Sequence, residues 1–170
     1  MNETIAISLF GLAIAVNAAS VFVQRRYKLH EKLFSNHAYL AHRILINVFW
    51  LAAIAGVIWA ATQTAPNLNI PVHRFGETLS WLGILGFIFS LKEIGFAGMQ
   101  NRDQFTGERK ELKGIYHYLH DPMYMSFTFI LLGVALSTGI YAFYAFAFLS
   151  LIGLQGILAA IENGPVKLKE

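Results

Sequence analysis

Residues 123–161 read MYMSFTFILLGVALSTGIYAFYAFAFLSLIGLQGILAAI, a run of 39 residues without a charge. A single helix of that length would extend about 58 Å, nearly twice the roughly 30 Å hydrocarbon core of a bilayer. The run must therefore fold back on itself. Its only good turn signal near the middle is Ser137-Thr138-Gly139. We predict two membrane-spanning helices here, joined as a tight hairpin.

Three further apolar stretches precede this hairpin. Ile5–Val23 and Ile44–Thr62 each cover 19 residues without a charge, and Thr78–Met99 is interrupted only by Lys92 and Glu93. Each stretch is long enough to cross a bilayer as a helix. The chain of 170 residues is 56% hydrophobic and 14% charged, unlike a typical soluble domain in both respects. We predict an all-α polytopic membrane protein with five spans in one domain, residues 1–170.

The positive residues predict how these spans are oriented. Of the 13 Lys and Arg residues, only Arg74 falls between the second and third spans. With five spans, the other 12 all fall on the side of the C-terminus. Because Lys and Arg mark the cytoplasmic side, we predict an outside N-terminus and a cytoplasmic C-terminus. The opening MNETIAIS lacks the basic start of a secretory signal, so we expect the first span to be retained, with Asn2 or Thr4 as its N-cap.

A polar cluster, YHYLHDPMY at residues 116–124, lies at the entrance of the fourth span. Pro122 suits the first turn of a helix, where its missing N–H costs nothing, and Asp121 suits the N-cap before it. The free N–H groups of such a helix start can also bind a ligand. The tyrosines fit an interfacial aromatic belt equally well. His117 and His120 lack a third ligand at sensible spacing, so we predict no metal.

Two other features lie at the same predicted face. Gly95 and Gly98, at the end of the third span, permit close approach of either a neighbouring helix or a ligand, and the spacing by itself favours helix packing. The mid-span glycines Gly83 and Gly86 are assigned to packing. Glu162 ends the fifth span, where an acid has the wrong sign for the helix dipole.

Taken in order, these segments resemble the small integral-membrane phospholipid N-methyltransferases of the phosphatidylethanolamine type. That family belongs to a wider group that includes the isoprenylcysteine carboxyl methyltransferases. The matching pieces, which follow a similar basic loop after the first span, are Gly95-Phe96-Ala97-Gly98, Asp103, Phe105, Asp121-Pro122-Met123-Tyr124 and Glu162. The resemblance covers most of the chain from residue 25 onward. The family pattern differs at Arg102, Ser126 and Asn163.

The resemblance implies S-adenosylmethionine as methyl donor and a phospholipid in the cytoplasmic leaflet as substrate, in a bacterial inner membrane or the endoplasmic reticulum. The amine head group of phosphatidylethanolamine, or of its partly methylated forms, would be methylated towards phosphatidylcholine. The expected cofactor-binding residues are Gly95, Gly98, Pro122, Tyr124 and Glu162. The expected catalytic residues are His120, Asp121 and Tyr124, with His120 or Asp121 as proton acceptor. Arg102 or Arg109 could hold the lipid phosphate. Nothing in the sequence indicates a nucleic-acid partner.

Two other functions remain open at this point. One is a related membrane methyltransferase with a different acceptor, either an isoprenylcysteine carboxylate or a small lipophilic molecule. The short C-terminal tail and the DPMY motif favour the phospholipid over these acceptors. The other is a degenerate, non-catalytic scaffold subunit of a membrane complex, an alternative kept open by Arg102 and Asn163.

Overall fold

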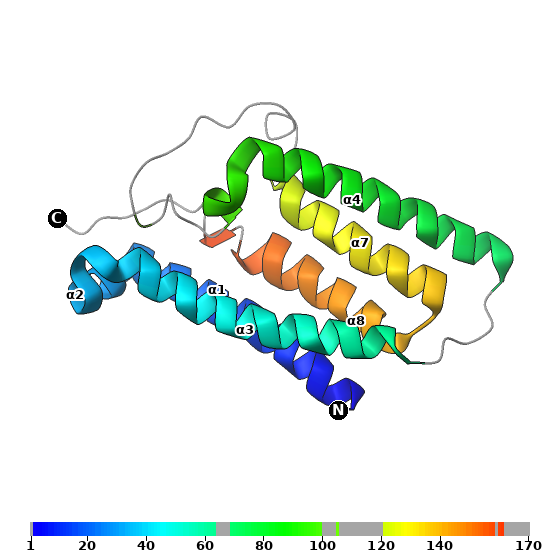
Figure 1. Ribbon diagram of the computed structural model, residues 1–170, viewed down its shortest axis with the longest axis horizontal. Helices are drawn as coiled ribbons and strands as arrows, with labels where there is room; N and C mark the ends of the chain where they lie inside the picture. Colours follow the sequence, from blue (N-terminus) through cyan, green and yellow to red (C-terminus); the bar gives the residue numbers. More distant parts are fainter. Residues whose placement is uncertain (1, 64–68, 100–104, 106–120, 159, 162–170) are drawn as a thin grey trace.

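The computed structural model describes residues 2–63, 69–99, 105, 121–158, 160 and 161, without the side chains of residues 96–99. All the regular structure in these residues is helical, as predicted (Figure 1). The elements in chain order are α1 (Glu3–Tyr27), α2 (Leu29–Phe34), the 3₁₀ turn η1 (Ser35–His37), α3 (Ala38–Ala61), α4 (Ile70–Met99), α7 (Pro122–Thr138), α8 (Tyr141–Leu149) and the π-helix η2 (Ser150–Leu158).

Within the described residues, four helical segments are long and apolar enough to cross a membrane: Glu3–Tyr27, Leu29–Ala61, Ile70–Gly95 and Tyr141–Leu158. The fourth predicted span corresponds to α7, which is apolar but only 17 residues long. The third predicted span begins earlier than expected, at Ile70 instead of Thr78, so Arg74 lies inside α4. Asn2 caps α1 as predicted, because its side-chain oxygen accepts a hydrogen bond of 2.9 Å from the Ile5 N–H.

The predicted hairpin is confirmed. α7 ends at Thr138, and Gly139 adopts the left-handed conformation (φ 68°, ψ 6°) before α8 begins at Tyr141. The Gly139 N–H donates to the Ala135 carbonyl at 2.7 Å, which satisfies one of the free carbonyls at the helix end. The long uncharged run therefore returns on itself at the predicted turn, because glycine occupies this conformation without steric cost.

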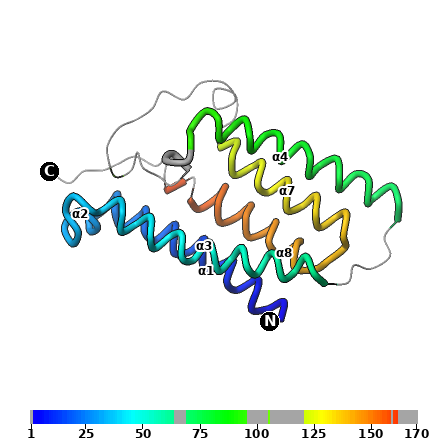
Figure 2. The backbone as a smooth tube through the Cα atoms, in the orientation of Figure 1, coloured from blue at the N-terminus to red at the C-terminus, as the bar shows by residue number. Residues whose placement is uncertain are grey.

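Two kinds of packing hold the bundle together. α4 lies along α7 and α1 lies along α3, while α8 and η2 contact both α1 and α7 (Figures 1 and 2). Between α4 and α7 the backbones approach closely: a Cβ at Gly83 would lie 2.7 Å from the Ile130 nitrogen. Gly86 likewise faces Ser126, which confirms the predicted packing role of both glycines.

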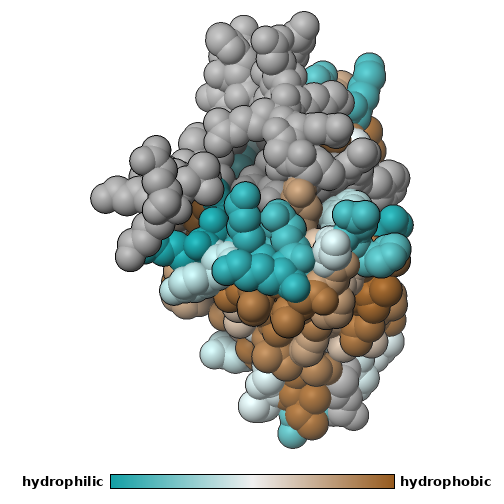
Figure 3. Space-filling model, turned by 90° about the vertical axis from the view of Figure 1, so that its left-hand side faces the viewer, coloured by the Kyte–Doolittle hydropathy of each residue, from teal (hydrophilic) through white to brown (hydrophobic). Residues whose placement is uncertain are grey.

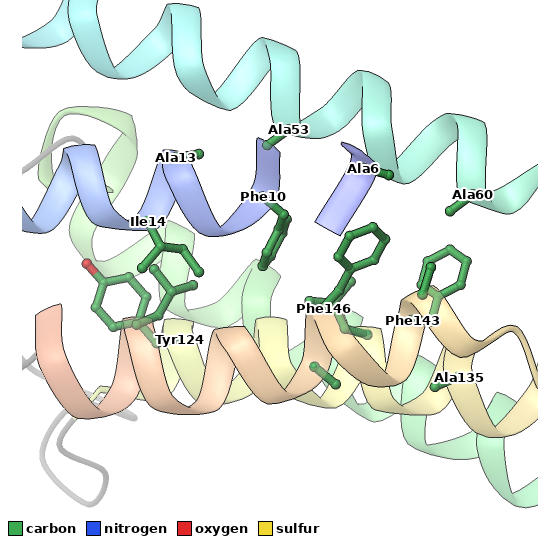
Figure 4. Packing of buried hydrophobic residues seen from close by; sticks show 14 of the residues in the cluster. Ala6, Phe10, Ala13, Ile14, Ala53, Ala60, Tyr124, Ala135, Phe143 and Phe146 are labelled. Carbon is green, nitrogen blue, oxygen red and sulfur yellow. The ribbon is translucent and has the colours of Figure 1, made fainter. Parts of the chain in front are cut away.

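The core between α1 and α8 is aromatic. The rings of Phe10 and Phe146 are both almost fully buried, with centroids 5.0 Å apart, and Trp50 of α3 meets Phe10 edge-on at 5.8 Å (Figure 4). Large aromatic side chains supply most of the dispersion contacts in such a core. α1 therefore packs against both α3 and α8, and it runs from this core to the end where α2 begins.

Candidate functional site

One end of the bundle brings together the segments that the sequence singled out. The C-terminal ends of α1, α4 and η2 and the N-terminal starts of α3 and α7 meet there (Figures 1 and 2). Seen from this end, hydrophilic side chains form a band beside a brown hydrophobic surface (Figure 3). We call it the α2 end, after the short helix that lies there. The hairpin turn at Gly139 lies at the opposite end.

α4 is interrupted at the α2 end. Gly95 has φ 70° and ψ 171°, a conformation that lies outside the helix and is essentially restricted to glycine. A Cβ added there would meet no described atom within 4 Å. Helix packing therefore does not require Gly95 to be a glycine, which corrects the packing interpretation for this residue. The break leaves N–H and carbonyl groups outside the helical hydrogen-bond ladder, where a polar ligand can use them.

α7 starts at the α2 end with the predicted proline. Pro122 is the first helical residue and is buried, and Asp121 occupies the N-cap position. The Asp121 side chain makes no capping hydrogen bond, because its backbone (φ −137°, ψ 70°) is not in the usual N-cap conformation, so the prediction of a side-chain cap was wrong. Tyr124 is 9% exposed and its ring lies beside Ile14 of α1 (Figure 4). Tyr124 therefore belongs to the junction between α7 and α1, not to a surface belt.

A hydrogen bond across the α2 end ties the end of the last helical segment to α1. The Arg25 guanidinium donates through Nη1 to the backbone carbonyl of Ile161. A cation at a helix C-terminus is favourable, because the free carbonyls there carry partial negative charge. Arg25 thus fixes the position of the residue that precedes Glu162 in the sequence.

A hydrogen-bonded polar cluster occupies the space between α1, α2 and α3. The Ser20 hydroxyl lies 2.7 Å from Nδ1 of His42 and 3.1 Å from Nε2 of His30. His42 is completely buried, Ser20 is 6% exposed, and His30 is half-buried. The three side chains form a continuous path from the protein interior towards its surface. We refer to Ser20, His30 and His42 as the His–Ser–His chain.

A second polar pair holds α2 against α1 beside this chain. Gln24, 2% exposed, donates through Nε2 to Glu31 Oε1 at 2.6 Å. Two buried atoms, Gln24 Oε1 and His30 Nδ1, have no hydrogen-bond partner within the described part of the chain. A buried polar atom without a partner costs about 1–3 kcal/mol. Natural proteins rarely keep such atoms without a functional reason or a bound water.

Phe105 connects the segment after α4 to this cluster. Its ring centroid lies 4.3 Å from that of His42 and 5.5 Å from that of His30, and Tyr39 of α3 is 5.9 Å away. The buried end of the His–Ser–His chain is therefore covered by the Phe105 ring. No described group of three or more His, Cys, Asp or Glu side chains is arranged to hold a metal ion.

Several predicted site residues lie outside the described part of the chain. These are His120, Arg102, Arg109 and Glu162. Gly98 falls within α4, but its surroundings are not described. Of the others, Gly95, Asp121, Pro122 and Tyr124 all lie at the α2 end. The roles assigned to these residues stay predictions.

Sequence reasoning missed Ser20, Gln24, His30 and His42, and it gave Arg25 only an orienting role. The sequence did contain a signal for two of these residues, Ser20 and Gln24. Ser20 and Gln24 are four residues apart, so they share one face of the first apolar span near its basic end. Polar residues within a membrane span are functional candidates by default. Their partners, two histidines for Ser20 and Glu31 for Gln24, come from the following segments, so only the fold could reveal the pairing.

Comparison with known proteins identifies the family to which this chain belongs. The family model of phospholipid methyltransferases matches residues 72–166, more than half of the chain. The match includes α4 with its break at Gly95, the start of α7 and the last helical segment. No curated protein and no solved structure matches the chain. The chain therefore belongs to the phospholipid methyltransferase family.

Proposed function

We propose that this protein transfers methyl groups from S-adenosylmethionine to the amine of phosphatidylethanolamine, or of its partly methylated forms, towards phosphatidylcholine. The observation that supports it most is the family match over residues 72–166, which includes Gly95, Pro122 and Tyr124. The acceptor lipid would lie in the leaflet that faces the cytoplasm. The membrane would be a bacterial inner membrane or the endoplasmic reticulum.

The charges at the α2 end support this orientation. The basic residues Arg25, Arg26, Lys28, Lys32, Arg43 and Lys92 lie near it, and Arg74 lies near the opposite end. Clustered Lys and Arg favour the cytoplasmic side and the anionic head groups found there. A phospholipid phosphate would meet complementary charge at this end. Arg102 and Arg109 are the proposed partners for that phosphate.

The residues at the α2 end offer polar contacts to the methyl donor. The interrupted helix at Gly95, where a Cβ would meet no described atom within 4 Å, offers backbone donors and acceptors to the polar groups of the donor. Gly98, Pro122, Tyr124 and Glu162 are the other proposed contacts. When bound, S-adenosylmethionine supplies an electrophilic methyl carbon, which needs no covalent help from the protein. The chain has to align the acceptor nitrogen with that carbon and exclude water.

The acceptor amine also has to lose a proton. A primary ammonium has a pKa of about 10 and is mostly charged at neutral pH, so its nitrogen lone pair is blocked. Asp121 and His120 are the proposed first acceptors of that proton, with Tyr124 positioned beside them. A general base of this kind contributes typically about 10²- to 10⁴-fold to a rate.

The experiment is an assay of the purified protein in vesicles that contain phosphatidylethanolamine, with methyl-labelled S-adenosylmethionine and lipid mass spectrometry. Labelled mono-, di- or trimethylated ethanolamine lipids are expected. Tyr124→Phe should reduce their formation, whereas Tyr144→Phe, on exposed Tyr144 of α8, should not. Label transferred only to a prenylcysteine peptide, or donor binding without any product, would rule out the proposed acceptor. Failure to bind the donor at all would favour a scaffold role.

A further inference from the structure

We propose that Ser20, His30 and His42 form a proton-transfer chain that carries the proton released in each methyl transfer from the interior of the α2 end to water. This inference rests on the proposed function, because only an acceptor that starts as an ammonium releases such a proton. Methylation of an ammonium lipid converts R–NH₃⁺ into R–NH₂CH₃⁺ and sets free one H⁺ for each methyl group. A site sealed against water has to give that proton an exit.

The hydrogen-bond geometry suits directional proton movement. A hydroxyl is both donor and acceptor, so Ser20 can accept from one imidazole while it donates to the other. With the proton of His42 on Nδ1, that N–H donates to Ser20 Oγ at 2.7 Å, and the Ser20 hydroxyl donates to Nε2 of His30 at 3.1 Å. A neutral imidazole carries one donor and one acceptor nitrogen, which allows each ring to pass a proton on.

The transfer balances atom by atom. A proton arriving at Nε2 of His42 is matched by movement of the Nδ1 proton to Ser20 Oγ. The original hydroxyl proton moves to Nε2 of His30, and the proton on Nδ1 of His30 leaves to a water molecule that reaches this buried nitrogen. Rotation of the hydroxyl and exchange of the ring tautomers restore the starting arrangement. No oxidant, reductant or metal is required.

Burial gives the chain its direction. His42 is 0% exposed and lies under the Phe105 ring, whereas His30 is half-buried on the short helix α2. Nδ1 of His30 is itself buried and has no hydrogen-bond partner among the described residues, a setting in which proteins commonly bind an ordered water. The inner end thus lies under the Phe105 ring, and the outer end is the half-buried ring of His30 on α2.

Charged and polar groups from three elements lie beside the chain. The Glu31 carboxylate on α2 accepts from Gln24 Nε2 at 2.6 Å, and the Arg25 guanidinium on α1 donates to the Ile161 carbonyl. Tyr39 on α3 contacts the Phe105 ring.

The main test variant is Ser20→Ala, which removes the bridging hydroxyl with little change in volume. In phosphatidylethanolamine vesicles, kcat should fall about 10- to 100-fold at pH 7, at the lower end of what positioned proton transfer contributes. The deficit should shrink as the pH rises towards the pKa of the amine, because the amine then loses its proton directly to water. KM for the donor should not change. His30→Gln should behave in the same way.

The matched control is His37→Gln, which removes an exposed histidine of η1 in the same segment. It should leave both rate and pH profile unchanged. A deficit in Ser20→Ala that is equal at all pH values, or no deficit at all, would overturn the proton-transfer chain while leaving the proposed function intact. A wild-type protein that forms no methylated amine lipid would instead remove the proposed function, and this inference with it.

A second readout does not depend on turnover. Nitrogen-15 NMR of histidine-labelled protein reports the tautomer of each imidazole. We expect the signals of both His30 and His42 to shift in Ser20→Ala, whereas His37→Gln should remove one signal and leave the others in place. Unchanged His30 and His42 signals in Ser20→Ala would show that the hydroxyl does not bridge the two rings, and would overturn the proposal.

Discussion

The two ends of the bundle use the same residue types for different purposes. At the hairpin end, His73 is 48% exposed, donates through Nδ1 to the Ser137 carbonyl at 2.7 Å and lies 3.4 Å from Glu77. At the α2 end, His42 is fully buried and hydrogen-bonded to Ser20. His73 can replace its partners with water, whereas His42 cannot. A histidine on the surface therefore joins two helices at little cost, while a buried one depends on its hydrogen bond to offset its desolvation.

The glycines at the two ends, Gly139 and Gly95, also differ in backbone conformation and in role. Gly139 has the left-handed conformation of an ordinary helix end, with its N–H bonded to the Ala135 carbonyl. Gly95 has φ 70° and ψ 171° and interrupts α4, and a Cβ added to it would meet no described atom within 4 Å. The first glycine completes a turn between two helices. The second opens a helix at the end where the methyltransferase site is proposed, which is where strained backbone most often accumulates.

The largest expected effect is the difference in stability between a variant of the buried His42 and one of the exposed His73. His42→Ala should lower the free energy of unfolding by about 2–4 kcal/mol, because it leaves a cavity and removes a partner of Ser20. His73→Ala should cost less than about 1 kcal/mol, since exposed contacts are replaced by water. Denaturant unfolding of both variants in detergent measures the difference. Equal losses would mean that the buried cluster contributes no more than a surface contact.

The next effect concerns the two glycines. Gly95→Ala should reduce methyl transfer about 10-fold or more, because alanine disfavours this backbone conformation by about 1–3 kcal/mol and draws α4 towards a continuous helix. Gly139→Ala should cost about 1–2 kcal/mol of stability through its positive φ but leave the activity of the folded protein unchanged. Activity per folded molecule and thermal unfolding separate the two. If Gly95→Ala retains full activity, the break in α4 is not needed by the site.

The smallest effect concerns the link between α1 and the last helical segment. Arg25→Met should weaken donor binding by about 1–2 kcal/mol, which is about 5- to 30-fold in KM, because a charge-assisted hydrogen bond to the Ile161 carbonyl is lost. Arg26→Met, one residue further on, is the matched control and should leave KM unchanged. A rise in KM of the same size in both variants would point to general loss of positive charge instead of loss of this hydrogen bond.

Sequence patterns were sufficient for features that follow from local chemistry. The length of the uncharged run required a hairpin, and its turn lies at Gly139 as predicted because few residues accept a positive φ. Pro122 opens α7 because proline suits the first helical turn. The boundary of α4 was missed, since its first turns from Ile70 include polar residues that do not look like a membrane span. The site was predicted only as a set of segments.

The order of helices and loops, the apolar spans and the resemblance to phospholipid methyltransferases were properties of the sequence by itself, because hydrophobic length, turn residues and short motifs are local. The tertiary structure alone decided that Ser20 meets histidines 10 and 22 residues later, that Phe105 covers them and that Arg25 reaches the Ile161 carbonyl. Such contacts depend on how α1 packs against its neighbours. A hydrogen bond requires its two atoms to lie about 3 Å apart, and no spacing along the chain specifies that across different helices.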